Sequence, residues 1–230
     1  MNLSPTRPDK ATEKRARESR GISNASIYEM VVRALKRRGI SGGTFADVGC
    51  GTGTLRDWVS PLVSAYIGVD AVRYEDFPSE AEFVHVDLDT GAAGLPDGSA
   101  DIVAAVETIE HLENPRAFVR ELVRLAKPGG WVIVTTPNQL SLLNLLSLLT
   151  KRRHVHFQDV HYPAHLSALI EVDLRRIAAE CGLADVGIEY SHRGRIPLTG
   201  LYYPRVLARL FPRALSDNVL MIGKISVAKG

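Results

Sequence analysis

The sequence predicts an α/β fold, in which a mostly parallel sheet is covered by helices on both faces. Apolar runs typical of buried strands alternate with segments of helical periodicity. The first of these strands runs into a glycine-rich turn, and the second ends in an acid. The chain has 230 residues, of which 45% are hydrophobic, so its size suits one domain with a full core.

The amino-terminal part of the chain divides into a tail and the start of a domain. Residues 1–21 contain six Lys or Arg, three Asp or Glu and almost no apolar side chain, so we expect a disordered basic tail. Residues 22–230 are expected to form a single domain. Its first helix is indicated by apolar residues at helical spacing, with Ser26 and Glu29 as a capping box.

The sequence FADVGCGTGTL at residues 45–55 predicts a buried strand, a tight turn and a helix that begins near Thr54. The turn contains Gly49, Gly51 and Gly53. Glycine lets a ligand approach the main chain, and the first N–H groups of a helix favour a carboxylate or a phosphate. The spacing is G-x-G-x-G, whereas a dinucleotide-binding turn has G-x-G-x-x-G, which disfavours a nicotinamide-dependent oxidoreductase.

Two acids strengthen the prediction of a ligand site at this turn. Asp47 precedes the glycines, and Asp70 follows the next apolar run, residues 65–69. A carboxylate at the end of the second strand of such a unit can accept hydrogen bonds from both hydroxyls of a ribose. The residues alone therefore indicate that an adenosine-bearing ligand could bind at the carboxyl edge of a parallel sheet.

The remaining elements are predicted from apolar runs and helix boundaries. Asn114 and Pro115 indicate the start of a helix that continues to Ala126 and stops at residues 127–130. The other strands are predicted at residues 82–86, 101–106, 131–135, 184–190 and 219–227, and a later helix at residues 172–181. Ligands of such sheets bind where the parallel strands end.

Residues 45–53 (FADVGCGTG) and 67–70 (IGVD) resemble the class I S-adenosylmethionine-dependent methyltransferases, and the resemblance covers about residues 26–190. It implies a Rossmann-like seven-stranded sheet, mostly parallel with an antiparallel edge strand, and S-adenosyl-L-methionine as the cofactor. It also implies substrate-side insertions at about residues 139–168 and 193–217.

The same resemblance assigns parts of the methyl donor to particular residues. The methionine end would lie near the glycine turn, the ribose on Asp70 and the adenine near Asp87. We interpret Cys50 as a small residue that fits the turn and not as a reactive thiol. The implied cofactor-binding residues are Asp47, Gly49, Cys50, Gly51, Gly53, Asp70, Asp87, Leu88 and Glu107.

The catalytic candidates follow the fourth strand, in the sequence ETIEH at residues 107–111. If these residues form a helical turn, Glu107, Glu110 and His111 share one face. Two carboxylates and one imidazole are half of a site for a divalent metal, which could bind an acceptor oxygen and lower its pKa. Without a metal, His111 would act as a lone base or orient the acceptor.

The E-x-x-E-H element resembles a motif of the ubiquinone-biosynthesis O-methyltransferases and of the small-RNA terminal 2′-O-methyltransferases. This implies a Mg or Mn ion held by Glu107, Glu110, His111 and His165, and catalytic roles for the last three. The Asp-His-x-Phe-Glu-Trp pattern of the RNA enzymes is absent, and the net charge is only +2, so we expect no nucleic-acid partner. Three further histidines are interpreted as loop or surface residues: His154, His156 and His192.

Residues 139–150 (QLSLLNLLSLLT) contain seven Leu and a polar residue at every third position from Ser141 to Thr150. A helix of this sequence is apolar over most of its circumference, and three basic residues, 151–153, follow it. Three interpretations remain open: a core helix, a lid over an apolar substrate, or an interfacial helix whose basic end faces anionic headgroups. The third would give peripheral membrane contact through residues 139–153.

These observations lead us to expect a transferase that methylates a hydroxyl group of a lipid-like, glycan or other small-molecule acceptor. The second half of the chain also resembles bacterial quinone and surface-glycan cluster methyltransferases. The alternatives are an N- or C-methyltransferase of a small molecule and a non-catalytic S-adenosylmethionine-binding module. The two cysteines lie far apart, and no leader or membrane-length apolar run is present, so we expect a cytoplasmic protein, peripheral at the membrane if residues 139–153 make contact.

Overall fold

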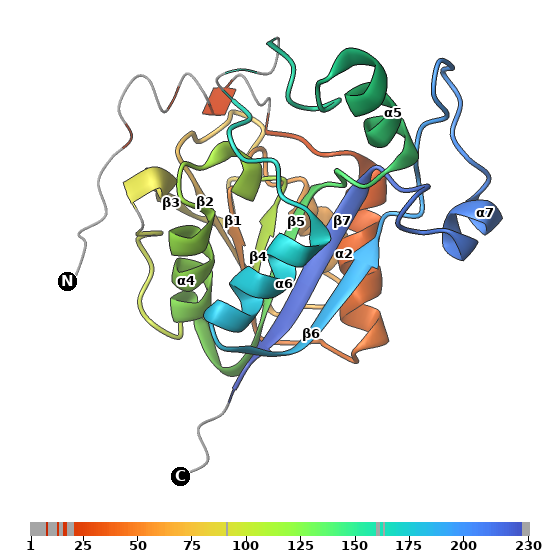
Figure 1. Cartoon of the computed structure of the whole chain (residues 1–230). Coiled ribbons are helices and arrows are strands. Elements are labelled where there is room, and N and C mark those ends of the chain that lie inside the picture. Colours follow the sequence, from red (N-terminus) through yellow and green to blue (C-terminus); the bar gives the residue numbers. More distant parts are fainter. Residues whose placement is uncertain are drawn as a thin grey trace.

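Figure 1 shows the computed structural model of the chain, which describes residues 8, 13, 16–17, 21–90, 92–159, 162 and 164–226. Most of the predicted tail, residues 1–21, lies outside the described residues. The division of the chain into a disordered tail and one domain therefore stays a prediction.

A seven-stranded sheet lies at the centre of the fold, with the strand order β3-β2-β1-β4-β5-β7-β6. Neighbouring strands from β3 to β5 are parallel, whereas β7 runs antiparallel to both β5 and β6. The predicted fold class is confirmed, although the antiparallel strand lies one place in from the edge. The strands are β1 (Thr44–Val48), β2 (Ala65–Asp70), β3 (Glu82–His85), β4 (Ala100–Val106), β5 (Ala126–Pro137), β6 (Leu183–Tyr190) and β7 (Asn218–Ile225).

Helices cover both faces of the sheet. α2 (Ala25–Arg37) and α3 (Leu55–Val59) pack on one face, and α4 (Pro115–Leu125) and α6 (Glu171–Glu180) pack on the other, which is the near face in Figure 1. The apolar strand β4 contributes side chains to the hydrophobic cores on both faces of the sheet, because its alternate residues point to opposite faces. A strand buried on both faces has no polar side, which explains why its sequence is continuously apolar.

The starts of α2 and α4 are fixed by side-chain caps. In α2 the cap is Asn24, whose Oδ1 accepts a hydrogen bond from the N–H of Ser26 at 3.2 Å. The predicted capping box at Ser26 is therefore wrong, since Ser26 already lies in the first turn and is buried. In α4 the prediction is confirmed, because Asn114 accepts from the N–H of Ala117 at 3.0 Å and Pro115 is the first helical residue.

The predicted stop of α4 at residues 127–130 belongs instead to the next strand. α4 ends at Leu125, and β5 begins at once with Ala126. The Nζ of Lys127 pairs with the carboxylate of Asp101 at 2.8 Å, which ties the start of β5 to the start of β4.

Helix α5 (Leu142–Lys151) is oriented with its polar side inward. Asn144 and Ser147 are only 2% and 8% exposed, whereas four of the leucines are 37–79% exposed. The Nδ2 of Asn144 donates to the carbonyl of Gln139 at 2.7 Å, and its Oδ1 accepts from the N–H of Val155 at 2.8 Å. The core-helix interpretation of this segment is therefore wrong.

Helices α5 and α7 (Arg205–Leu210) lie beyond the end of the sheet at which the parallel strands finish (Figure 1). The first N–H of α5, from Leu142, donates to the carbonyl of Ala214 at 2.8 Å, so the two insertions are joined. The two 3₁₀ turns, η1 (Leu88–Thr90) and η2 (Ile109–His111), follow β3 and β4. Among the described residues, no helix combines the length and the apolar character that crossing a bilayer requires.

Candidate functional site

A cavity of about 450 Å³ opens at the carboxyl edge of the sheet. Its walls come from the ends of β1, β2 and β4, from residues 21–28 and from both insertions. Gly53 is the one predicted site residue that does not line it. The predicted residues that do line it are Asp47, Gly49, Cys50, Gly51, Asp70, Asp87, Leu88, Glu107, Glu110, His111 and His165.

The glycine turn after β1 requires glycine for two separate reasons. Gly49 and Gly51 have φ values of 84° and 53°, in the left-handed region that residues with a Cβ rarely adopt. A Cβ on Gly49 would lie 2.2 Å from the hydroxyl of Thr108, and one on Gly51 would lie 2.1 Å from the carbonyl oxygen of Gly21. The turn is therefore packed against two other segments and still presents bare backbone to the cavity.

Residues just before α2 form a wall over this turn. The carbonyl of Gly21 accepts a hydrogen bond from the N–H of Thr52 at 2.9 Å. The three following residues, 22–24, line the cavity, as does Tyr28, whose hydroxyl accepts from the N–H of Ser23 at 2.9 Å. Our sequence analysis did not identify residues 21–24 as part of the site.

Asp70 is the carboxylate at the end of β2. Its two oxygens accept hydrogen bonds from the N–H groups of Gly51 at 2.8 Å and Val72 at 3.1 Å, so β2 and the glycine turn hold it in place. Burial raises the pKa of Asp70. Each oxygen keeps a lone pair, and these suit a pair of neighbouring hydroxyl groups.

Asp47 lies deeper, at 2% exposure. One oxygen accepts a hydrogen bond from the hydroxyl of Tyr66 at 2.6 Å, and the other is buried with no partner among the described residues. Burial raises the pKa of Asp47 to about 7. An unpartnered buried carboxylate oxygen is costly unless a ligand supplies a donor, and a cationic amine is the donor that suits it best.

Cys50 is packed and not poised for chemistry. Its side chain is 6% exposed, and its sulfur would lie 2.9 Å from a Cβ placed on Gly68. Burial raises the pKa of the Cys50 thiol, and the nearby carboxylates act in the same direction. The geometry agrees with its interpretation as a small residue that fits the turn.

The residues of this half of the cavity fit an adenosine-bearing amino acid such as S-adenosylmethionine. The bare turn provides backbone N–H groups, Asp70 faces the cavity as a diol acceptor, and Asp47 offers an unpartnered oxygen for an ammonium group. Asp87 and Leu88, the predicted neighbours of the adenine, line the same cavity.

Glu107 does not share a helical face with the other catalytic candidates. Its φ is 51°, and it precedes the 3₁₀ turn η2, so the predicted helical turn over residues 107–111 is wrong. Its carboxylate accepts hydrogen bonds from Thr135 and from the Nδ2 of Asn218, both at 2.8 Å. Burial raises the pKa of Glu107 to about 7.

Glu110, His111 and His165 do converge. Each can present a ligand atom such that all three atoms lie within 4.8 Å of one another. The two imidazole rings meet edge to face, with centroids 4.6 Å apart. Glu110 is 1% exposed, one of its oxygens has no hydrogen-bond partner among the described residues, and burial raises its pKa. Glu107 is not part of this group.

His111 is held in one tautomer. Its Nδ1 lies 2.7 Å from the carbonyl oxygen of Ala164, and because a carbonyl only accepts, Nδ1 carries the hydrogen. Burial lowers the pKa of His111, which favours the neutral ring. The lone pair of Nε2 is therefore available to accept a proton or to bind a metal.

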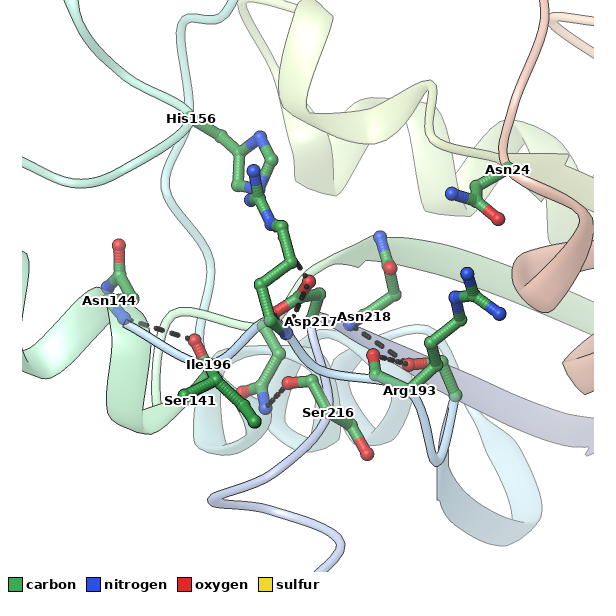
Figure 2. Close-up of polar contacts among 12 residues, drawn as sticks. Asn24, Ser141, Asn144, His156, Arg193, Ile196, Ser216, Asp217 and Asn218 are labelled. Carbon is green, nitrogen blue, oxygen red and sulfur yellow. Dashed lines mark hydrogen bonds and ion pairs between the residues drawn. The ribbon is translucent and has the colours of Figure 1, made fainter. Parts of the chain in front are cut away.

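The second insertion contributes side chains that the sequence did not single out. Arg193, Arg195 and Tyr202 line the cavity, as does His156, which was predicted to be a loop or surface residue. The Nε of Arg195 pairs with Asp217 at 3.1 Å, and Arg195 also lies 3.2 Å from the Nε2 of His156. Figure 2 shows the side chains of Arg193, Asn218 and Asn24 pointing toward the same space.

Comparison with known proteins agrees with this geometry. Residues 23–187 match a family described as "Methyltransferase domain". The "Ubiquinone biosynthesis O-methyltransferase" of Albidiferax ferrireducens is 28% identical over 186 residues, which are 71% of this chain and 68% of the relative. A "Probable S-adenosylmethionine-dependent methyltransferase" of Mycolicibacterium smegmatis is 32% identical over 117 residues, so that match spans 50% of this chain and 45% of the relative.

The fold also occurs among solved structures. A SAM-dependent methyltransferase from Archaeoglobus fulgidus superimposes with a TM-score of 0.58 at 21% identity, covering 86% of this chain and 94% of that one. At this identity the likeness concerns the fold alone.

Proposed function

The chain belongs to this methyltransferase domain family and is a class I S-adenosylmethionine-dependent enzyme, and from this premise we propose that it methylates an oxygen atom of its acceptor. The observation that supports oxygen is the imidazole of His111 in the cavity wall, which burial keeps neutral and the carbonyl of Ala164 holds in one tautomer. A hydroxyl must lose its proton when it is methylated, so it needs such a base. A nitrogen or carbon acceptor would have less need of a neutral imidazole at this position.

Each residue has a defined task in this reaction. S-adenosylmethionine supplies an activated methyl group bound to a sulfonium sulfur. The glycine turn, Asp47 and Asp70 bind the donor and fix its position, which is most of what an in-line displacement requires. The Nε2 of His111 accepts the hydroxyl proton as the acceptor oxygen forms its bond to the methyl carbon.

A divalent metal at Glu110, His111 and His165 is a second form of the same proposal. One carboxylate and two imidazoles are a donor set for a first-row ion, and two nitrogen ligands favour manganese over magnesium. A bound ion would lower the pKa of an acceptor hydroxyl. Glu107 is left out of this set, because its carboxylate is bonded to Thr135 and Asn218.

Labelled S-adenosylmethionine, incubated with lipid, glycan and phenolic acceptor pools, would test the proposal. His111→Ala should lower turnover by about a hundredfold or more without changing donor affinity. His192→Ala, a histidine outside the cavity lining, is the matched control. Methylation only of amines or carbon centres, or full activity of His111→Ala, would refute the oxygen assignment.

The metal form needs a measurement besides activity. The metal content of the purified protein, after dialysis against manganese, should fall in both His165→Ala and Glu110→Gln. If no metal is retained and a chelator leaves activity unchanged, His111 acts as a lone base. In that case His165→Ala should keep most of its activity.

The insertions support an acceptor that is lipid-like, and we propose that they touch an anionic lipid surface. Four leucines of α5 point outward, and further exposed apolar residues lie on and beside α7; the set is Leu142, Leu145, Leu146, Leu149, Val206, Leu207, Leu210 and Phe211. Residues 139–153 and 193–215 hold eight of the 28 Lys and Arg, two of which line the cavity, and none of the 26 Asp and Glu. Outward leucines beside basic side chains complement an anionic bilayer.

Sedimentation with vesicles would test this contact. The protein should bind phosphatidylglycerol vesicles better than phosphatidylcholine vesicles, and Leu149→Glu should weaken binding by about tenfold because it removes a membrane-facing side chain. Val172→Glu, at an exposed apolar position on α6, is the control. Equal binding of the two variants, or no binding by the unmodified chain, would refute the contact.

A further inference from the structure

Arg193 is a cation in the cavity wall whose guanidinium has no hydrogen bond or ion pair with any residue that the structure describes. Its Nε is shielded from solvent and lacks a partner. The guanidinium carbon lies 3.9 Å from the centre of the Tyr202 ring, so the group stacks on an aromatic face. A stacked guanidinium keeps the N–H groups along its edge available for a ligand.

Arg195, in the same insertion, differs from Arg193 because its side chain is paired with a carboxylate. The carboxylate of Asp217 accepts from the Nε of Arg195 at 3.1 Å and from its backbone N–H at 3.2 Å and 3.3 Å. The carboxylate of Glu107, next along the wall, is occupied by Thr135 and Asn218. Both carboxylates are therefore engaged by other groups, and the charge of Arg193 acts on Asp217 without a hydrogen bond from its guanidinium to any described residue.

The position of Arg193 in the fold indicates which ligand it meets. It follows β6, the edge strand, and lies in the second insertion. Asp47 and Asp70, assigned to the donor, lie in the last two residues of β1 and β2, which are on the other side of β4 in the sheet. The two halves of the cavity are thus separated by the central strand, after which the base His111 is placed.

We propose that Arg193 binds an anionic group, a carboxylate or a phosphate, that the acceptor carries. This inference rests on the proposed function and deepens it, because it names the class of acceptor. A guanidinium fork matches either anion with two parallel hydrogen bonds, and the partly dehydrated wall strengthens them. The acceptor is then a hydroxyl compound with an anionic group on the side of the cavity away from the glycine turn.

Binding of small anions to the protein loaded with S-adenosylhomocysteine tests the site without turnover. Benzoate and phenyl phosphate are the probes, and phenol is the neutral comparison. Arg193→Gln should weaken the binding of both anions by about tenfold, which is the loss expected for one charged hydrogen-bonded contact. The affinity for phenol should not change. Arg193→Lys should restore part of the affinity, and Arg209→Gln, on the exposed side of α7, should have no effect.

The same titrations separate this proposal from its rivals. If Arg193 instead holds the carboxylate of the donor, Arg193→Gln will lose affinity for S-adenosylhomocysteine but not for 5′-methylthioadenosine, and the proposal is overturned. Equal anion binding by the unmodified chain and Arg193→Gln also overturns it. If the unmodified chain does not bind S-adenosylhomocysteine, the donor assignment fails, and anion binding to the unloaded protein still decides the role of Arg193.

Discussion

Replacing Asn144 with Ala tests whether α5 is held by its polar side. The amide of Asn144 bonds the carbonyl of Gln139 at 2.7 Å, the N–H of Val155 at 2.8 Å and the Nδ1 of His154 at 2.9 Å. Each buried bond contributes about 1 kcal/mol net, so Asn144→Ala should lower the free energy of unfolding by about 3 kcal/mol. Urea unfolding followed by tryptophan fluorescence would measure the loss.

The control is Leu149→Ser on the outer side of the same helix. Leu149 is 79% exposed, so this change should alter the free energy of unfolding by no more than about 0.5 kcal/mol. Hydrogen exchange over residues 139–159 would show whether Asn144→Ala releases α5 alone or the whole domain. If α5 were a core helix the order would reverse, since burying Leu149 would make its loss the more costly one. That reversal would refute the orientation.

Three further predictions concern the turn, the buried acid and the link between α2 and β6. Gly51→Ala should weaken the binding of S-adenosylhomocysteine by about tenfold or more in calorimetry, because the added Cβ would strain a φ of 53° and lie 2.1 Å from a backbone carbonyl oxygen. The control is Gly39→Ala, which has a φ of 63° and no atom within 4 Å of the added Cβ, and it should bind S-adenosylhomocysteine with unchanged affinity. Asp47 has its pKa raised to about 7 by burial, so the stability of the ligand-free protein should fall by up to about 4 kcal/mol as the pH rises from about 4 to 7. Asp47→Asn should remove that part of the slope in thermal melts, and identical slopes would contradict the assignment. Glu189→Ala should lower the free energy of unfolding by about 2 kcal/mol, because it removes a buried carboxylate that pairs with arginines that are 22–65% exposed, one of them at 2.8 Å. Glu180→Ala, which breaks an exposed pair of 2.9 Å, should cost less than about 1 kcal/mol in the same unfolding assay.

Local signals were enough to predict the sheet and to bring the residues assigned to the donor to one end of it. The strand β4, the glycine turn and the cap at Asn114 each depend on residues close together in sequence, and each is found where it was expected. Asp47 and Asp70 could be placed for the same reason, since parallel strands bring their carboxyl ends to one edge.

What the sequence did not predict depends on contacts between distant segments. The polar stripe of α5 indicated a helix, but only the bonds of Asn144 to Gln139 and Val155 determine that this stripe faces inward. Glu107 departs from helical geometry because Thr135 and Asn218, on β5 and β7, hold its carboxylate. A search for basic residues directly after the last parallel strand would have found Arg193 and Arg195.

The contact between Gly21 and Thr52 has a practical consequence for expression of this enzyme. A purification tag joined directly to Gly21, in place of residues 1–20, would lie beside the donor turn and disturb its wall. The last strand, β7, begins near the cavity and runs away from it. Its residue Asn218 pairs with Pro137 near the cavity, and Lys224 pairs with Trp131 at the opposite end of the sheet. A tag attached after β7 would therefore emerge far from the chemistry, and kinetic work is better served by that arrangement.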